Sequence, residues 1–266
     1  MKEGTLTLPG LDMDYITFGK GEKPLVMIQG LNTRGIHGAG PGLSWMYRIF
    51  SKGYTVWLFD RRKDLQAGVT IRDLTADLAA AMDAAGIANA DILGVSQGGM
   101  MAQELAIQRP DLVRKLVLAV TLSRPNPTVE GVIRGWMAMT EAKNWKALVR
   151  DMAEKMYSPA YLRRYKPFLP LLTLAQKPKD APRFLALAQS CLTCDTYDRL
   201  HQIRCPVLVI GGQQDQVVTG EASKELAQKL GCELVLYDDL GHAAYEEAKD
   251  FNQRVYDFFT KEEPYV

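Results

Sequence analysis

Apolar residues along this chain follow two patterns that alternate, short continuous runs and longer segments of helical spacing. The short runs occupy residues 24–28, 54–59, 92–95, 115–120, 206–210 and 233–237, and Thr55, Lys115 and Glu233 are their only polar or charged residues. Between them, apolar residues recur every three or four positions, as at Leu74, Leu78 and Met82. Runs without polar alternation are typical of strands buried on both faces, which occur in parallel sheets covered by helices. The pattern predicts an α/β fold with a mostly parallel central sheet flanked by helices.

The beginning of the chain follows a different pattern. Residues 5–8 and 13–18 alternate apolar and polar positions, and a turn is indicated at residues 19–21. Because strict alternation is typical of strands with one solvated face, these segments predict an antiparallel ribbon at the edge of the sheet. Residues 30–42 then form a long glycine-rich stretch, and loops of that length in compact domains are usually functional or disordered.

The alternation of strand and helix stops after residue 122 and resumes near residue 203. The stretch between them has helical periodicity. It is interrupted at Pro125, Pro127, Asn144, Pro159, Pro167, Pro170 and Pro178,. We therefore predict an α/β core formed by residues 1–122 and 203–266, and a helical cap, the insertion, formed by residues 123–202. At the C-terminus, a single helix is predicted from about Ala243 to Phe259, with Phe258 among its buried residues.

The insertion differs from the core in charge. Between Thr121 and Arg204 there are 14 Lys and Arg against 7 Asp and Glu, whereas the rest of the chain has 18 against 24. One interpretation is that these residues form solvated helical faces. The alternative is a positively charged lid over the functional site, which would favour substrates that carry a carboxylate.

Overall composition excludes several classes of function. The 266 residues are 47% hydrophobic, so the core can form without a metal or a disulfide,. A net charge of +1 provides no field for nucleic acid or an acidic membrane surface,. No leader-like or membrane-spanning apolar run is present, so we expect a cytoplasmic protein that acts on a small molecule,. Cys191 and Cys194 are interpreted as small apolar residues rather than a metal or redox pair. The oligomeric state is not predicted.

One short motif stands between a predicted strand and a predicted helix. Gly94, Ser96 and Gly98 form the pattern G-x-S-x-G, and helical spacing continues from there until Pro110,. In this setting the serine sits on a strained turn that lifts its hydroxyl out of the sheet, with close backbone contacts on both sides that only glycine allows. The first N–H groups of the following helix point towards an oxygen bound near the serine. The motif therefore predicts that Ser96 is a nucleophile.

A serine hydroxyl needs a base within hydrogen-bond reach, and the chain has only three histidines,. His201 lies in the insertion, where a position on the surface or at a helix end is expected. His37 lies in the loop after the first buried strand and is a candidate substrate contact. His242 follows the last predicted strand directly, at the end of the strand where ligands bind in open parallel sheets. We predict that His242 is the base.

The base in turn needs a carboxylate to orient it. Asp215 lies just beyond the carboxyl end of the buried run at residues 206–210. Asp238 and Asp239 are alternatives, although they share a loop with His242. With Asp215 the chain order is Ser96, Asp215, His242, which is the order found in hydrolases with the G-x-S-x-G turn.

These residues resemble a known family. The chain resembles capped α/β-hydrolases of the esterase and lipase type. The resemblance is carried by the segments 94–99, 211–215 and 241–242, which occur in that order, and by the helical insertion. The resemblance covers residues 14–259. It implies a mostly parallel sheet, serine hydrolase chemistry without a metal or cofactor, and a substrate cleft between core and cap.

The resemblance also implies an oxyanion hole formed by the backbone N–H groups of Leu31 and Gln97. Two departures from the family occur. Where the family commonly has His-Gly after the first buried strand, this chain has Gln29 and Gly30. The aspartate turn of the family often continues into proline, whereas residues 217–220 contain none.

The predicted reaction is attack of Ser96 on a carbonyl carbon while His242 accepts the serine proton and Asp215 holds the imidazole. A small or medium carboxylic ester is the expected substrate, by analogy with other proteins of this fold. The same three residues would also serve for cleavage of a carbon–carbon bond, a lactone or a thioester. A receptor of hydrolase fold with negligible turnover would have the same sequence features.

The walls of the substrate pocket have no readable motif. We name His37, Trp136 and Met139 as candidate pocket residues, with ordinary packing in the cap as the alternative for the two apolar ones. Further apolar candidates in the insertion are Met137, Trp145, Met152 and Met156.

Overall fold

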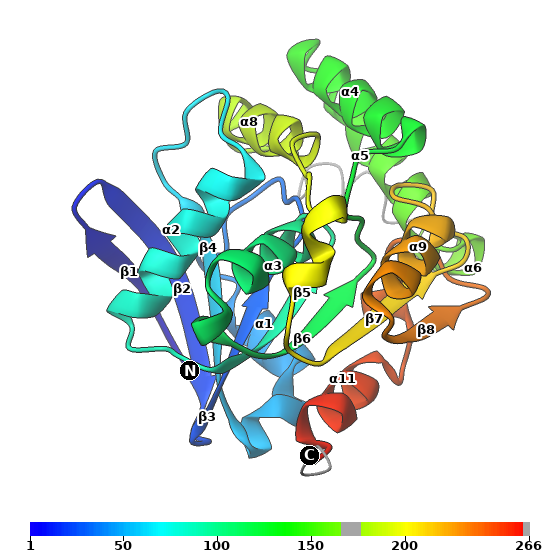
Figure 1. Ribbon diagram of the computed structural model, residues 1–266. Coiled ribbons are helices and arrows are strands. Elements are labelled where there is room, and N and C mark those ends of the chain that lie inside the picture. Colours follow the sequence, from blue (N-terminus) through cyan, green and yellow to red (C-terminus); the bar gives the residue numbers. More distant parts are fainter. Residues whose placement is uncertain (166–176, 263–266) are drawn as a thin grey trace.

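A computed structural model describes residues 1–165 and 177–262. At its centre is an eight-stranded sheet with the strand order β1-β2-β4-β3-β5-β6-β7-β8 (Figure 1). The strands are β1 (Lys2–Leu8), β2 (Leu11–Gly19), β3 (Lys23–Ile28), β4 (Tyr54–Arg62), β5 (Ala90–Val95), β6 (Val113–Ala119), β7 (Val207–Gly212) and β8 (Glu233–Tyr237).

The pairing of the strands follows their hydrophobic patterns. β1 pairs with β2 and β2 with β4 in antiparallel orientation, and all other neighbours from β4 to β8 are parallel. Every residue of β5 and β7 is buried, as expected for strands covered on both faces,. β1 lies at the edge and has no fully buried residue. The predicted α/β fold with a mostly parallel sheet is confirmed.

Helices of the core cover both faces of the sheet (Figure 1). One hydrophobic cluster joins the sheet to α2 (Ile71–Ala84), α3 (Gln97–Gln108) and α9 (Gly220–Leu230). A second cluster on the opposite face includes α1 (Gly40–Met46), η1 (Arg48–Lys52) and α11 (Phe251–Thr260). A short turn, η2 (Pro110–Leu112), follows α3. At the start of α2, Thr70 and Asp73 form a capping box, which typically contributes about 1 kcal/mol,.

The insertion between β6 and β7 is helical in its described part. It contains α4 (Pro127–Glu141), α5 (Trp145–Met156), α6 (Pro159–Tyr165), α8 (Ala181–Cys191) and η4 (Tyr197–Gln202). The side chains of Asn126, Asn144 and Asp180 cap α4, α5 and α8 by accepting a backbone N–H from the first turn,. The helix breaks predicted at Pro167 and Pro170 lie outside the described residues.

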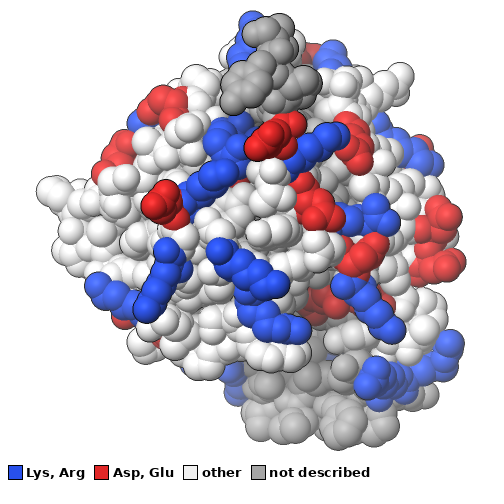
Figure 2. Space-filling model, turned by 90° about the horizontal axis from the view of Figure 1, so that it is seen from below, with Lys and Arg blue, Asp and Glu red and all other residues white. Residues whose placement is uncertain are grey.

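Arginines of the insertion and its two flanks bind carboxylates of the core. Arg183 of α8 lies 3.1 Å from Asp60 at the end of β4, and Arg199 of η4 lies 2.6 Å from Glu104 of α3. Arg124, just before α4, forms an ion pair with Glu225 of α9. The opposite charges of the two regions therefore meet at their contact. On the face viewed in Figure 2, Lys and Arg side chains lie among Asp and Glu side chains.

The prediction of one C-terminal helix was wrong. The structure has α10 (Ala244–Glu247) and α11, separated at Ala248, which is extended with ψ 118°. The N–H and hydroxyl of Ser158 donate to the carboxylate of Glu247 at 2.9 and 2.5 Å, which ties α10 to the insertion. Helical spacing within residues 243–259 does not reveal that Glu247 contacts Ser158, which lies 89 residues away in the sequence. Phe258, predicted to be buried, is only partly buried.

Among the helices of the described residues, none combines the length and the apolar character that a membrane span requires.

Candidate active site

The turn between β5 and α3 carries Ser96 in a strained conformation. Its φ is 53°, a value that L-residues other than Asn and Asp rarely adopt,. A Cβ atom on Gly94 would lie 2.6 Å from the carbonyl oxygen of Gly98, and one on Gly98 would lie 2.0 Å from that of Ile28. Both positions therefore require glycine, and the tight contacts hold the serine at the point where strand passes into helix.

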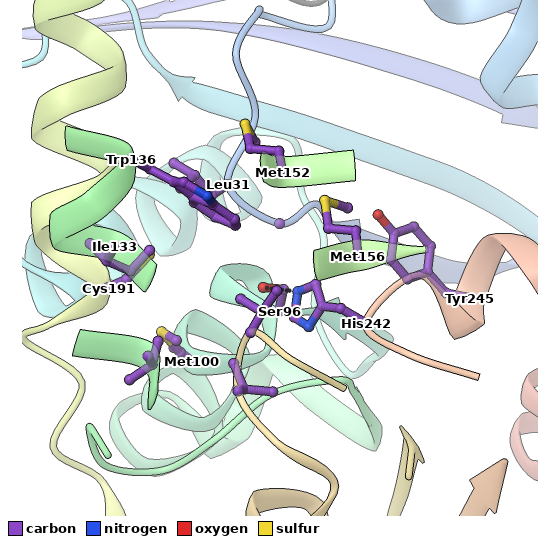
Figure 3. Close-up of a pocket in the computed structure, with 14 residues that line it drawn as sticks. Leu31, Ser96, Met100, Ile133, Trp136, Met152, Met156, Cys191, His242 and Tyr245 are labelled. Atoms are coloured by element: carbon purple, nitrogen blue, oxygen red, sulfur yellow. Dashed lines mark hydrogen bonds between the residues drawn. The ribbon is translucent and has the colours of Figure 1, made fainter. Parts of the chain in front are cut away.

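Three side chains from different strand ends meet at this turn, and two of them, Ser96 and His242, are drawn in Figure 3. His242 Nε2 lies 2.9 Å from Ser96 Oγ, and His242 Nδ1 lies 2.8 Å from Asp215 Oδ2. Ser96 follows β5, Asp215 follows β7 and His242 follows β8, so all three lie at the carboxyl ends of parallel strands. His242 is 4% exposed and Asp215 6% exposed, so the hydrogen bond between them is buried, whereas the one to Ser96 is partly buried beside the pocket. Chemically, this arrangement can transfer the serine proton to the imidazole.

The carboxylate of Asp215 is fixed on both of its oxygens. While Oδ2 faces His242, Oδ1 accepts the backbone N–H groups of Val217 and Val218 at 2.7 and 2.9 Å. Burial by itself would raise the pKa of Asp215, but the adjacent His242 and these N–H donors outweigh burial and lower the pKa below 3.8,. Proline could replace neither Val217 nor Val218 without loss of one of these bonds, since proline has no N–H to donate,. The alternatives Asp238 and Asp239 are exposed.

Two peptide groups next to Ser96 are candidate oxyanion donors. A Cβ atom on Gly30 would lie 3.2 Å from Ser96 Cβ, so the loop that continues to Leu31 runs beside the serine. Gln97 is the first residue of α3, where helical N–H groups have no partner within the helix,. Within residues 1–165 and 177–262, no hydrogen bond engages the N–H of Leu31 or of Gln97.

A pocket opens above Ser96 and is lined mainly by apolar side chains (Figure 3). The insertion supplies one wall through α4, α5 and α8. The residues that line the pocket are Gly30, Leu31, Ser96, Met100, Val129, Ile133, Trp136, Met152, Met156, Cys191, Val217, Val218, His242 and Tyr245. Among these described residues there is no Lys, Arg, Asp or Glu. The described part of the pocket wall therefore does not have the positive charge that a basic lid would provide.

Of the pocket candidates named from sequence, Trp136, Met152 and Met156 line the pocket, whereas His37, Met137, Met139 and Trp145 are not among its lining residues. The indole Nε1 of Trp136 donates to Asp151 at 2.8 Å, which leaves the ring as an apolar wall. Met139 does not line the pocket, because the lining residues of α4 recur at Val129, Ile133 and Trp136, and Met139 falls beside that stripe,.

His37 is exposed and also lies outside the pocket. The carboxylate of Glu3 in β1 accepts the N–H groups of Gly38 and Gly40 at 2.9 and 2.8 Å, so this part of the loop is tied to the sheet edge. Sequence reasoning missed other lining residues, among them Cys191 and Tyr245. Val217 and Val218 could have been proposed as lining residues, since they lie two and three positions after the predicted catalytic residue Asp215.

The insertion also touches the loop that carries His242. The carbonyl oxygen of Met156, the last residue of α5, accepts the N–H of Ala243 at 2.8 Å. Tyr157 Oη donates to Glu246 of α10 at 2.7 Å. The position of the imidazole is thus supported from the side of the insertion as well as from the core.

Among the described residues, no group of three His, Cys, Asp or Glu side chains could hold a metal ion.

Comparison with known proteins agrees with this architecture. The chain is 25% identical over 226 residues to 3-oxoadipate enol-lactonase 2 from Acinetobacter baylyi, an alignment that covers 81% of this chain and 80% of that protein. It is 27% identical over 292 residues to 2-hydroxy-6-oxononadienedioate/2-hydroxy-6-oxononatrienedioate hydrolase 2 from Pseudomonas putida, covering 97% of this chain and 94% of that protein.

Among solved structures, an enol-lactonase from Burkholderia xenovorans superimposes with a TM-score of 0.85 at 22% identity, covering 97% of this chain and 100% of that one. The sequence model described as "Alpha/beta hydrolase family" matches residues 36–254. The chain is therefore a member of the alpha/beta hydrolase family.

Proposed function

We propose that this protein is a serine hydrolase in which Ser96 is the nucleophile, His242 the general base and Asp215 the residue that orients the base. The observation that carries the proposal is the continuous hydrogen-bonded path from Ser96 Oγ through both ring nitrogens of His242 to Asp215 Oδ2, with distances of 2.9 and 2.8 Å. A serine hydroxyl with a base at this distance, itself oriented by a buried carboxylate, is the arrangement that activates serine at neutral pH.

In the first half-reaction, Ser96 Oγ attacks the carbonyl carbon and its proton passes to His242 Nε2. The carbonyl oxygen becomes an oxyanion, for which the N–H groups of Leu31 and Gln97 are the proposed donors. When the tetrahedral intermediate collapses, His242 gives the proton to the leaving alcohol, and an acyl group remains on Ser96. In the second half-reaction, His242 takes a proton from water, which attacks the acyl carbon and releases the acid.

For the substrate, we propose an uncharged carboxylic ester with a small or medium apolar acyl group. The support is the pocket wall, whose side chains are almost all apolar and which includes no Lys or Arg among the described residues. A carboxylate in such a wall would lose its hydration without gaining a counter-charge. Lactone hydrolysis is a second candidate, because the relative from Acinetobacter baylyi bears the name of an enol-lactonase.

The test compares substrate classes on one preparation of enzyme. Initial rates are measured for nitrophenyl acetate, butyrate and hexanoate, for a simple γ-lactone and for a thioester, with the Ser96→Ala variant as control. We expect turnover of esters in the wild type and none above background in Ser96→Ala. If no acyl compound is hydrolysed by the folded wild type, the chain is better described as a ligand receptor of hydrolase fold.

A further inference from the structure

Arg61, near the end of β4, is a buried arginine that the mechanism above does not use. Its side chain is 2% exposed and it is the largest of the fully buried residues. Burial lowers the pKa of Arg61 to about 10, so the guanidinium is still charged at neutral pH. A buried charge of this kind lowers the free energy of unfolding unless its contacts compensate for the lost hydration. The contacts of the guanidinium therefore show which segments Arg61 holds in place.

All hydrogen bonds of the guanidinium come from a single nitrogen, Nη2. It donates to the carbonyl oxygen of Gln29 at 2.5 Å and to Gln97 Oε1 at 2.9 Å, and it approaches the carbonyl oxygen of Gly30 at 3.5 Å. Among the described residues, Nε and Nη1 have no hydrogen-bond partner. One nitrogen thus binds both segments that carry the proposed oxyanion donors, the loop before Leu31 and the residue Gln97.

The orientation of these contacts fits the positioning of N–H groups. In a trans peptide the C=O and the N–H point in opposite directions. Because the carbonyl of Gly30 faces Arg61, the N–H of Leu31 in the same peptide group points away from the guanidinium. Gly30 and Leu31 also line the pocket together with Ser96.

The side chain of Gln97 continues the chain of contacts into the insertion. While its Oε1 accepts from Arg61, its Nε2 donates to the carbonyl oxygen of Leu187 in α8 at 2.7 Å. The side chain is 0% exposed, so it does not reach substrate. It fixes the rotation of the residue whose backbone N–H is the second proposed donor.

From these contacts we infer that Arg61 is a positioning residue that holds the oxyanion-binding peptide groups of Leu31 and Gln97 in register beside Ser96. The inference rests on the proposed serine hydrolase function. Gln29 stands where the family commonly has histidine. In this chain, Arg61 of β4 binds the carbonyl oxygen of Gln29 and so holds the loop that begins there.

The test uses Arg61→Met, which removes the charge and the donors at similar volume. The neighbouring Arg62 provides a matched control, because it points to the other face of β4 and pairs with Asp77 of α2,. For Arg61→Met we expect kcat on a nitrophenyl ester to fall about 10²-fold, the scale of one lost oxyanion donor, with KM changed less than about threefold. Affinity for a boronic acid, whose adduct with serine is tetrahedral and anionic, should fall in parallel. For Arg62→Met we expect a lower Tm with kcat unchanged.

A second variant keeps the test decisive if Arg61→Met does not fold. Gln97→Met retains the backbone N–H but loses the contact with Arg61, and we expect kcat and boronic acid affinity to fall about tenfold together. A folded Arg61→Met or Gln97→Met enzyme with kcat and boronic acid affinity within about threefold of wild type would overturn the inference. Reaction of the wild type with a fluorophosphonate at Ser96 is measured first; failure there would contradict the proposed function itself, before Arg61 is tested.

Discussion

The core and the insertion contribute to the candidate site in different ways. The core supplies Ser96, Asp215 and His242, each placed in the turn or loop that follows a parallel strand and each fixed by backbone contacts or by hydrogen bonds to its neighbours. The insertion supplies apolar side chains such as Trp136 and Met152, which line the pocket through packing. Proposed chemistry is thus concentrated in short local motifs, whereas proposed specificity depends on how separate helices pack over them.

The two regions also differ in charge, and the structure gives this difference a role. The insertion and its flanks carry an excess of Lys and Arg, the core an excess of Asp and Glu. Arg183 and Arg199 bind Asp60 and Glu104 of the core at distances of 3.1 and 2.6 Å. Both carboxylates are almost fully buried, so water and salt screen these pairs less than exposed ones,. Part of the positive charge of the insertion therefore contacts the core.

The largest effect is expected in the core, at Asp215. Asp215→Asn should reduce kcat about 10⁴-fold, because the amide favours the wrong imidazole tautomer. Circular dichroism should show an intact fold. A loss below about tenfold would assign the orienting role to another acid, and Asp238 and Asp239 would be tested next.

The same variant should change the dependence of stability on pH. Because the pKa of Asp215 is lowered in the folded state, its carboxylate stabilises the fold above the unfolded value of about 3.8,. That contribution is lost as pH falls through the lower folded-state pKa. The difference in unfolding free energy between wild type and Asp215→Asn should be largest near pH 6 and shrink below pH 3.8. A difference that stays constant from pH 6 to pH 3 would contradict the lowered pKa.

The next largest effect is expected at Leu31, where two substitutions distinguish the role of the backbone N–H from that of the side chain. Leu31→Ala keeps the N–H and should keep kcat within a few-fold, whereas Leu31→Pro removes the N–H and should reduce kcat by about 10²–10³-fold. Thermal unfolding of both variants controls for disruption of the loop. A folded Leu31→Pro enzyme with near-native turnover would mean that a different group stabilises the oxyanion.

A smaller effect is expected in the insertion, on specificity. Met152 lines the pocket and Met139 does not, yet both are partly buried methionines of the same region. Met152→Ala should change the ratio of kcat/KM for hexanoyl and acetyl esters about tenfold, and Met139→Ala should leave the ratio unchanged. Equal shifts in both variants would mean that the insertion acts through its overall stability and not through the pocket wall.

The smallest effect is expected from substrate charge. With no basic side chain among the described lining residues, neutral and anionic esters with the same leaving group should differ little in their response to salt. We expect the ratio of their kcat/KM values to change less than about twofold between 0.05 and 0.5 M salt, across which the Debye length shortens severalfold. A strong preference for the anionic ester that disappears at high salt would restore the idea of a positive lid.

The accuracy of the sequence-based predictions follows the same division between local and long-range determinants. The buried strands were predictable because each is a continuous apolar run, and the turn at Ser96 because Gly94 and Gly98 are required by backbone contacts within one strand–turn–helix unit. The break after α10 was not, because helical spacing continues through residues 243–259 whereas the backbone leaves the helix at Ala248.

The positions of His37 and Arg61 show the same limit. His37 is held away from the pocket because Glu3 binds the next glycines of its loop, a contact that spans 35 residues. In the sequence, Arg61 lies within the charged stretch of residues 60–64, and only the fold brings it against Gln29 and Gln97. Hydrophobic periodicity and motifs of a few residues do not encode such pairings.

The most direct test of the central claim is to identify the serine that reacts. The folded protein is treated with a fluorophosphonate at neutral pH, and the modified peptide is mapped by mass spectrometry, with Ser96→Ala and Asp215→Asn treated in parallel. We predict a single phosphonylated residue, Ser96, with no labelling in Ser96→Ala and much slower labelling in Asp215→Asn. Modification of another serine, or labelling of Ser96→Ala at the wild-type rate, would contradict the assignment of Ser96 as the nucleophile.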